Sequence, residues 1–233
     1  MRTCILCLPR SGGQYCENLI ASLDSQCMRL GEYLEGWNES DYLLDENNRL
    51  VKENINSVIS PFAINSKYLH RLELLKNADK EQNFTMRLFV FDDYVLTDIV
   101  DSLAGSGFAF ASLQRDFYSI AMSYVLAFNY AIQGNPIWTI NSQISNPVTV
   151  HIPSTKRVLD RIYAAFNNWN NNLAKLNIDY KQFNYDTLVN DITDAFGSFP
   201  NYQGNKTVTH DYLTHIVNKD DVVKMIDSYA SGL

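Results

Sequence analysis

The 233-residue sequence lacks any apolar run near the roughly 18 residues that a membrane-spanning helix needs. It also lacks an excess of basic side chains, since 19 Lys and Arg stand against 26 Asp and Glu, for a formal net charge of −7. Proteins that cover DNA or RNA usually present a net basic face. We therefore expect no membrane span and no nucleic-acid partner, whereas a local basic pocket for a small anion is compatible with the charge.

Cysteine is absent after residue 27, and the four thiols are Cys4, Cys7, Cys16 and Cys27. Cys4 and Cys7 form a C-x-x-C inside an apolar run, where a strand would direct them to opposite faces. No second cysteine pair or histidine pair completes a zinc site, so we predict no metal site. Reduced, buried thiols are typical of a cytoplasmic protein, and we expect that location.

The chain begins with a strand, a turn and a helix. The apolar run Ile5–Leu8 is shorter than the h-region of a signal peptide, about 7–15 residues, and it lacks a small-residue cleavage site, so we interpret it as a buried strand. A turn at Ser11–Gly13 follows, and helical apolar spacing continues from Tyr15 to Leu23.

Further strands and helices alternate along the chain. Apolar runs predict strands at Phe84–Phe91, Phe108–Leu113 and Ile178–Asn184, and a short edge strand at Val148–Ile152. Helical spacing predicts helices at Ser66–Leu75, Tyr94–Leu103, Ile120–Ile132, Pro153–Lys175, Thr187–Phe196 and Asp220–Tyr229. The polar segment 41–60 is predicted to be a loop or an insertion.

This alternation favours an α/β fold with a parallel sheet covered on both faces. The length suits one domain over residues 1–233. We expect a three-layer sandwich around a central parallel sheet of about five strands.

The turn after the first strand is a candidate anion site. It reads Pro9-Arg10-Ser11-Gly12-Gly13, where small residues let backbone N–H groups surround an anion at a helix N-terminus. Arg10 can add a charge-assisted contact. A tight turn with an exposed arginine is the alternative. The G-x-x-x-x-G-K-[ST] motif of kinases and NTPases is absent, which argues against an ATP kinase.

This segment resembles the first motif of the sulfotransferase superfamily, a strand followed by P-[KR]-S-G-T-T and a helix. Gly13 and Gln14 stand where the family usually has hydroxyl residues. The resemblance implies a P-loop NTPase-like fold and a donor, 3′-phosphoadenosine 5′-phosphosulfate. It also implies a catalytic Arg10 that neutralises charge on the leaving oxygen. The donor-binding residues that it implies in this segment are Arg10, Ser11, Gly12, Gly13, Gln14 and Tyr15.

A second motif of that family is an arginine with a serine eight residues later, which together hold the 3′-phosphate of the donor. Arg115 and Ser123 have this spacing, between a predicted strand and an apolar helix. Arg115 with Asp116 at a helix start, and an ordinary helical serine, form the alternative interpretation. Tyr185-Asp186-Thr187-Leu188 is similar to the end of the family's late strand. Lys206 lies where the family often places a basic loop, although a surface lysine is an equal alternative.

The resemblance implies transfer of a sulfuryl group to a hydroxyl or amine of a small-molecule or glycan acceptor, releasing adenosine 3′,5′-bisphosphate. The acceptor needs a general base. The strand FTMRLFVFDD, where one branch of the family carries a histidine, has none. Glu32 is our first candidate base, as in bacterial carbohydrate sulfotransferases, followed by Glu35, with His210 in reserve. Two solvated loop acids are the alternative interpretation of Glu32 and Glu35.

Two other functions remain open. One is a nucleotide-binding module without catalysis, which Gly13 and Gln14 favour because they depart from the family motif. The other is a P-loop kinase, which the missing Lys-Ser/Thr pair disfavours.

Overall fold

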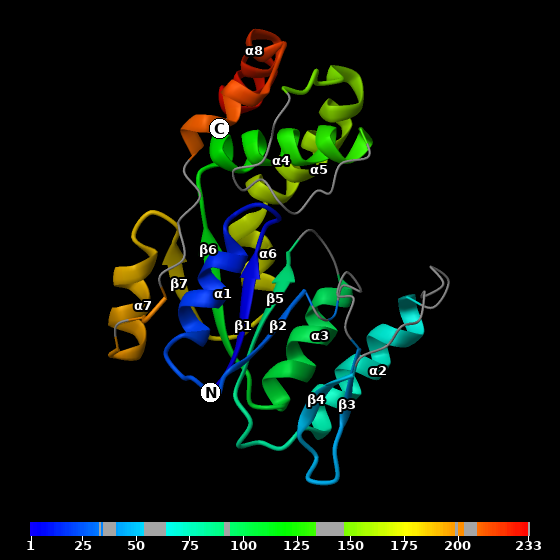
Figure 1. The fold of residues 1–233 in the computed structure, drawn as a ribbon, viewed down its shortest axis with the longest axis vertical. Helices are drawn as coiled ribbons and strands as arrows, with labels where there is room; N and C mark the ends of the chain where they lie inside the picture. Colours follow the sequence, from blue (N-terminus) through cyan, green and yellow to red (C-terminus); the bar gives the residue numbers. More distant parts are fainter. Residues whose placement is uncertain are drawn as a thin grey trace.

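The computed structural model describes residues 1–32, 34, 41–53, 64–90, 94–133, 147–198, 200–202 and 209–232. Five strands form one parallel sheet in the order β2-β5-β1-β6-β7 (Figure 1). Their bounds are β1 Arg2–Cys7, β2 Met28–Gly31, β5 Phe84–Phe89, β6 Ala109–Gln114 and β7 Tyr180–Asn184. The predicted central parallel sheet of about five strands is confirmed.

Strand β1 lies at the centre of this sheet, and all six of its residues are buried. It pairs with β5 on one side and β6 on the other. Cys4 packs into the apolar cluster on one face of the sheet, whereas Cys7 packs into the cluster on the other face. The prediction that these two thiols point in opposite directions is therefore confirmed, and none of the four cysteines, all of which the structure describes, forms a disulfide.

Helices cover both faces of the sheet. Helices α1 (Gly13–Ala21) and α7 (Leu188–Phe196) share one apolar cluster with β1, β6 and β7. Helices α3 (Tyr94–Gly105) and α6 (Trp169–Lys175) contribute to the larger cluster on the other face. This arrangement is the three-layer α/β sandwich expected from the alternation of elements.

Three further helices pack together beyond the carboxyl ends of β1 and β5, at the top of Figure 1. They are α4 (Phe117–Ile132), α5 (Ile152–Asn167) and α8 (Lys219–Ala230). The rings of Phe117, Tyr163 and Tyr229 join them, with centroids 5.1 to 6.2 Å apart. A 3₁₀ segment, η3 (Thr209–His215), precedes α8. None of the helices in the described ranges is long and apolar enough to cross a membrane.

The first half of segment 41–60 corrects a prediction. It is an antiparallel hairpin, β3 (Asp41–Leu44) and β4 (Leu50–Glu53), and not a loop, while residues 54–60 lie outside the described ranges. Asp45 accepts hydrogen bonds from the backbone N–H groups of Asn47 and Arg49, which closes the turn. Leu50 is fully buried, and α2 (Ile64–Asn77) packs against β3. The hairpin was not recognised in the sequence because its two strands are short and its turn is polar.

Two other boundaries differ from the predictions. The expected helix 153–175 breaks at Asn168, which ends α5 and caps α6, because its backbone leaves the helical region. The expected edge strand 148–152 is wrong, because Val148 makes a single parallel bridge to Ile216 outside the main sheet. Strand β2 was not predicted. It has four residues, and only Leu30 among them is buried.

Candidate functional site

The loop between β1 and α1 is tightly curled by its own backbone. The Ser11 N–H donates to the carbonyl oxygen of Leu8 at 3.2 Å, and the Ser11 hydroxyl donates to the same oxygen at 2.7 Å. Arg10 and Gly12 both adopt left-handed backbone angles, with φ of 67° and 94°. The loop therefore turns back on itself directly before the helix.

Gly12 is required at its position for two reasons. Its φ lies in the region that glycine favours, and a Cβ there would lie 2.1 Å from Cε2 of Tyr185. Tyr185 follows β7, so the end of the last strand packs across the loop. Tyr185, which belongs to the late-strand segment similar to the family's, therefore contacts this loop at Gly12.

The N-terminus of α1 presents backbone donors to which the helix itself offers no acceptor. The first helical hydrogen bond runs from the Cys16 N–H to the Gly12 carbonyl, at 3.0 Å. The N–H groups of Gly13, Gln14 and Tyr15 precede it and so have no acceptor within the helix. The N-cap residue, Gly12, has no side chain with which to cap this terminus. These groups suit an anion, as helix N-termini commonly do.

The two sequence motifs meet at this loop. The Nε of Arg10 donates to Oγ of Ser123 at 3.0 Å, and Nη1 of Arg115 donates to the carbonyl oxygen of Arg10 at 3.3 Å. The Arg115 guanidinium also lies over the Tyr185 ring, 4.2 Å from its centroid. Ser123 and Arg115 are both buried. Ser123 and Arg115, from the second motif, thus both contact Arg10, from the first.

Neighbouring groups shift the pKa of Arg10 in opposite directions. Burial, the largest effect, lowers the pKa of Arg10, and the neighbouring Arg115 cation lowers it further. Tyr212 and the Glu32 carboxylate raise the pKa. An arginine remains protonated through such shifts. Two neighbouring guanidinium groups at a helix N-terminus therefore form a cationic site suited to a multiply charged anion.

Asp116 has the capping role that the alternative interpretation gave it. Its side chain accepts a hydrogen bond from the Ser119 N–H at 2.7 Å and so caps α4. Arg115, one residue earlier, contacts the loop and Tyr185. The cap and the loop contact therefore coexist, and Asp116 orients the helix that carries Ser123.

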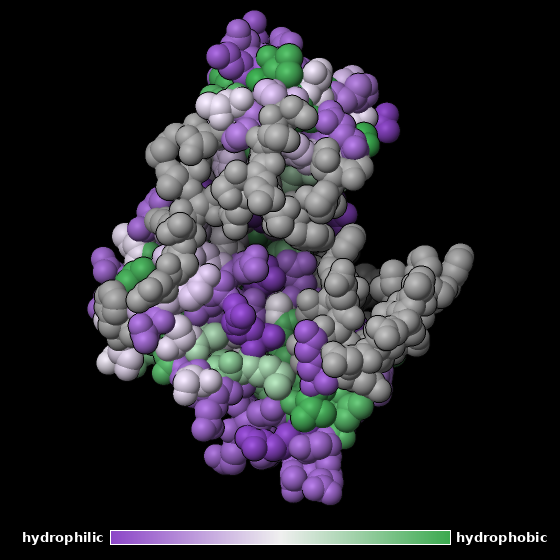
Figure 2. Space-filling model, viewed as in Figure 1, coloured by the Kyte–Doolittle hydropathy of each residue, from purple (hydrophilic) through white to green (hydrophobic). Residues whose placement is uncertain are grey.

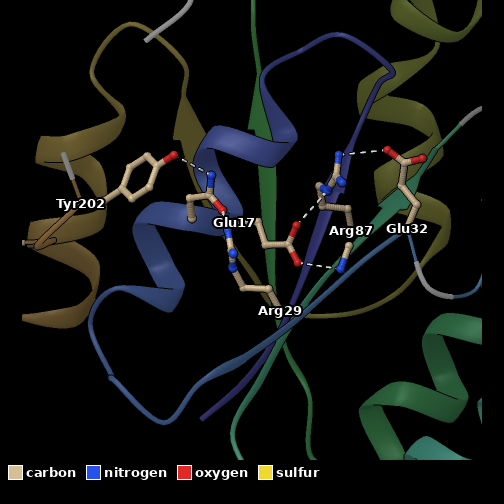
Figure 3. A network of polar contacts seen from close by, with 7 residues as sticks. Glu17, Arg29, Glu32, Arg87 and Tyr202 are labelled. Carbon is tan, nitrogen blue, oxygen red and sulfur yellow. Dashed lines mark hydrogen bonds and ion pairs between the residues drawn. The ribbon is translucent and has the colours of Figure 1, made fainter. Parts of the chain in front are cut away.

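Glu32 is buried and ion-paired, so the alternative of a solvated loop acid is wrong for this residue. Its Oε1 accepts from Nη1 of Arg87 at 2.9 Å (Figure 3). Arg87, in β5, also donates through Nε to Oε2 of Glu17, in α1, at 2.9 Å. Oε1 of Glu17 accepts from the Gly31 N–H at 2.8 Å. Glu32 thus belongs to a network that links the end of β2 to β5 and α1.

Sequence reasoning missed Glu17 and Arg87. The available signal was one charged residue within each of two otherwise uncharged segments, GQYCENLIA and FTMRLF. Burial raises the pKa of Glu17, and the Arg87 cation partly offsets this rise. Such a carboxyl is stable in the interior only with a partner.

The network extends along the outer side of α1. Hydrophilic residues gather at the middle of the face seen in Figure 2, in the region where Figure 1 shows α1 and β2. Asn18 donates to the Tyr202 hydroxyl at 2.9 Å and accepts from Arg29 (Figure 3). Tyr15 packs against both Tyr185 and Tyr202, with centroids 6.2 and 6.0 Å apart. The first turn of the helix is therefore flanked by aromatic rings.

Three predicted site residues are not tested by the geometry. Lys206 and Glu35 lie outside the described residues, and the side chain of His210, in η3, is not described. Within the described ranges, no group of three or more His, Cys, Asp or Glu is placed to hold a metal ion.

The sequence matches no family model and no curated protein. Among solved structures, the chain is similar to the sulfotransferase domain from the curacin biosynthetic pathway, with a TM-score of 0.46 at 14% identity over 99% of this chain and 96% of that one. It is also similar to a chain from the PezAT chromosomal toxin–antitoxin system of Streptococcus pneumoniae, with a TM-score of 0.37 at 10% identity over 100% and 87%. Both likenesses are weak, and neither bears on activity.

Proposed function

We propose that this protein is a sulfotransferase that uses 3′-phosphoadenosine 5′-phosphosulfate as its donor. The observation that carries the proposal is the 3.0 Å hydrogen bond from Arg10 to Ser123. It joins the loop of the first motif to the helix of the second, and Arg115 donates to the same loop. A donor with phosphates at both its 5′ and 3′ positions needs two anion sites close together, and this cluster supplies them.

Each group has a role in this proposal. The backbone N–H groups of Gly13, Gln14 and Tyr15 bind the 5′-phosphosulfate together with Arg10, Ser11 and Gly12. Arg115 and Ser123 bind the 3′-phosphate, with Lys206 as a further contact. As the sulfuryl group departs, negative charge grows on the leaving phosphate oxygen, and Arg10 neutralises it.

The reaction is an in-line displacement. The acceptor oxygen or nitrogen forms a bond to sulfur while the bond from sulfur to the phosphate oxygen breaks, and adenosine 3′,5′-bisphosphate leaves. The acceptor proton passes to a carboxylate. Glu32 suits this role because its charge acts on Arg10, so it lies close to the loop. Its Oε2 has no hydrogen-bond partner among the described residues, whereas Oε1 is held by Arg87. Glu35 and His210 remain the alternative bases, and the acceptor class is a small molecule or a glycan.

A non-catalytic nucleotide-binding module is the second candidate. A Cβ on Gly13 would lie 2.8 Å from Sγ of Cys7 and 3.1 Å from Cδ of Arg87, so the hydroxyl residue of the family motif does not fit there. Such a module would bind the donor through the backbone and would not consume it. A kinase stays disfavoured by the missing Lys-Ser/Thr pair.

Calorimetry with adenosine 3′,5′-bisphosphate and with ATP tests the proposal. We expect the bisphosphate to bind more tightly, because Arg115 and Ser123 suit a 3′-phosphate that ATP lacks. Equal affinity, or a preference for ATP with magnesium, would contradict it. Mass spectrometry of the donor incubated with a panel of hydroxylated sugars, phenols and amines then separates the enzyme from the module, since only the enzyme consumes donor.

A further inference from the structure

Glu17, Gly31, Glu32 and Arg87 form a closed ring of contacts. Glu17 uses Oε1 to accept from the Gly31 N–H and Oε2 to accept from Nε of Arg87. Arg87 uses Nη1 to reach Glu32, the residue that follows Gly31. Glu32 is therefore fixed to α1 twice, once through its backbone neighbour and once through its carboxylate (Figure 3).

The charges of the ring depend on one another. Glu17 has 2% of its surface exposed and Glu32 has 8%, and one guanidinium serves both carboxylates. Arginine can do this because its planar fork carries donors that point in separate directions, which a lysine ammonium on its flexible stem does not match. Arg87 is thus the member that orients the other two.

Gly13 makes room for Arg87. The nearest neighbours of a Cβ at Gly13 would be Sγ of Cys7 and Cδ of Arg87, at 2.8 and 3.1 Å. The first residue of α1 therefore lies directly on the Arg87 side chain. Gly13, which departs from the sulfotransferase motif, thus leaves the space beside α1 that the side chain of Arg87 needs.

We propose that Arg87 and Glu17 are positioning residues that hold the Glu32 carboxylate against the phosphate loop. The inference rests on the proposed function, in which Glu32 is the general base. The same helix, α1, then presents the donor-binding N–H groups at its first turn and anchors the base through Glu17. Donor and base are positioned by one rigid element, which is what an in-line transfer requires.

Arg87→Lys tests the role of the ring in turnover. The variant keeps the cation, so the buried Glu17 stays compensated and the fold is retained, but one ammonium cannot hold both carboxylates in place. We expect kcat to fall by about 10²-fold, the loss that a misplacement near 1 Å produces, with little change in the KM for the donor. In a Glu32→Gln background the same substitution should cost nothing further, because Arg87 acts through Glu32.

Arg29→Lys is the matched control. Arg29 lies beside Glu17 on the same face of the sheet and contacts Asn18, but it does not contact Glu32. We expect its kcat to match that of the wild type. A further loss in the Glu32→Gln background that equals the loss in the wild type would overturn the proposal, since Arg87 would then act on structure in general.

Hydrogen exchange provides a readout that does not depend on activity. The Gly31 amide is held by Glu17, which uses its second oxygen for Arg87. Arg87→Lys loosens Glu17, and glutamine offers one acceptor oxygen to the two donors. Arg87→Lys and Glu17→Gln should therefore each speed exchange of the Gly31 amide by about 10-fold, the effect of losing one hydrogen bond of ordinary strength, and Arg29→Lys should not. If the Gly31 amide exchanged at the wild-type rate in both variants, the proposal that Arg87 and Glu17 position this segment would be wrong. A wild-type protein that exchanges as expected but binds no adenosine 3′,5′-bisphosphate would instead overturn the proposed function, so the two failures are distinguishable.

Discussion

Arg10 donates a hydrogen bond from Nε to Oγ of Ser123, a residue 113 positions further along the chain. The contact joins the loop after β1 to the second turn of α4. It exists because β1 and β6 are neighbours in a parallel sheet, so that their carboxyl ends open at the same edge. Arg115, which follows β6, reaches the same loop. The candidate site is thus a product of strand order.

Arg115→Ala should weaken the binding of adenosine 3′,5′-bisphosphate by about 1.5–3 kcal/mol, the range for hydrogen bonds to charged groups. The fold should survive, because Arg115 follows the carboxyl end of β6 and is not part of a strand. Calorimetry measures the change, and Arg157→Ala, an exposed arginine of α5, is the control. Normal donor affinity in Arg115→Ala would show that the 3′-phosphate site lies elsewhere.

Glu32→Gln should lower turnover by about 10²–10⁴-fold, the usual contribution of a general base, while donor affinity stays close to that of the wild type. Glutamine keeps the size of the side chain and can still accept from Arg87 through its oxygen, so the loss reflects missing basicity. The measurement is kcat with an acceptor found by the screen. If Glu32→Gln kept full activity while Glu35→Gln or His210→Ala lost it, the base would be one of those residues.

Gly12→Ala should destabilise the protein and weaken donor binding together. A left-handed backbone at a non-glycine residue costs about 1–3 kcal/mol, and the new methyl group would overlap the Tyr185 ring. For a chain of this size we expect the unfolding midpoint to fall by roughly 2–4 °C per kcal/mol. Gly105→Ala is the control, since a Cβ there meets nothing within 4 Å. Equal midpoints for the two variants would show that the loop relaxes freely.

Cys27 should react slowly with iodoacetamide. Burial raises the pKa of its thiol to about 11 from 9.0, and Asp24 adds to the rise. Because only the thiolate reacts, this higher pKa lowers the reactive fraction at pH 8 by about 100-fold. The rate, followed by peptide mass spectrometry, should rise about tenfold per pH unit between 8 and 10, as expected below the pKa of a thiol. A rate that levels off near pH 9 would contradict the burial of this thiol.

Several elements were predictable from local sequence because their signals are local. The apolar run of β1 predicted a central strand, since a strand buried on both faces reads as continuous hydrophobic sequence. The glycines after it predicted the turn. The spacing of Arg115 and Ser123 indicated an arginine at a strand end and a hydroxyl about two turns into the next helix, and this is where the two residues lie.

Other elements left too weak a local signal. Strand β2 has only four residues, and the β3–β4 hairpin is short and built around a polar turn, so neither shows a long apolar period. The helix break at Asn168 follows from one backbone conformation within an asparagine-rich stretch that has no strong preference.

Most of the strands and helices, the loop with its glycines, and the paired arginine and serine were predictable from the sequence alone. Which charges are shared depends on how distant strands and helices pack. Arg87 lies 70 residues from Glu17 and 55 residues from Glu32, and no spacing rule links residues from a helix, a central strand and the end of another strand. Their pairing follows from burial, because a carboxylate removed from water requires a cation and the parallel sheet places this one guanidinium between two of them.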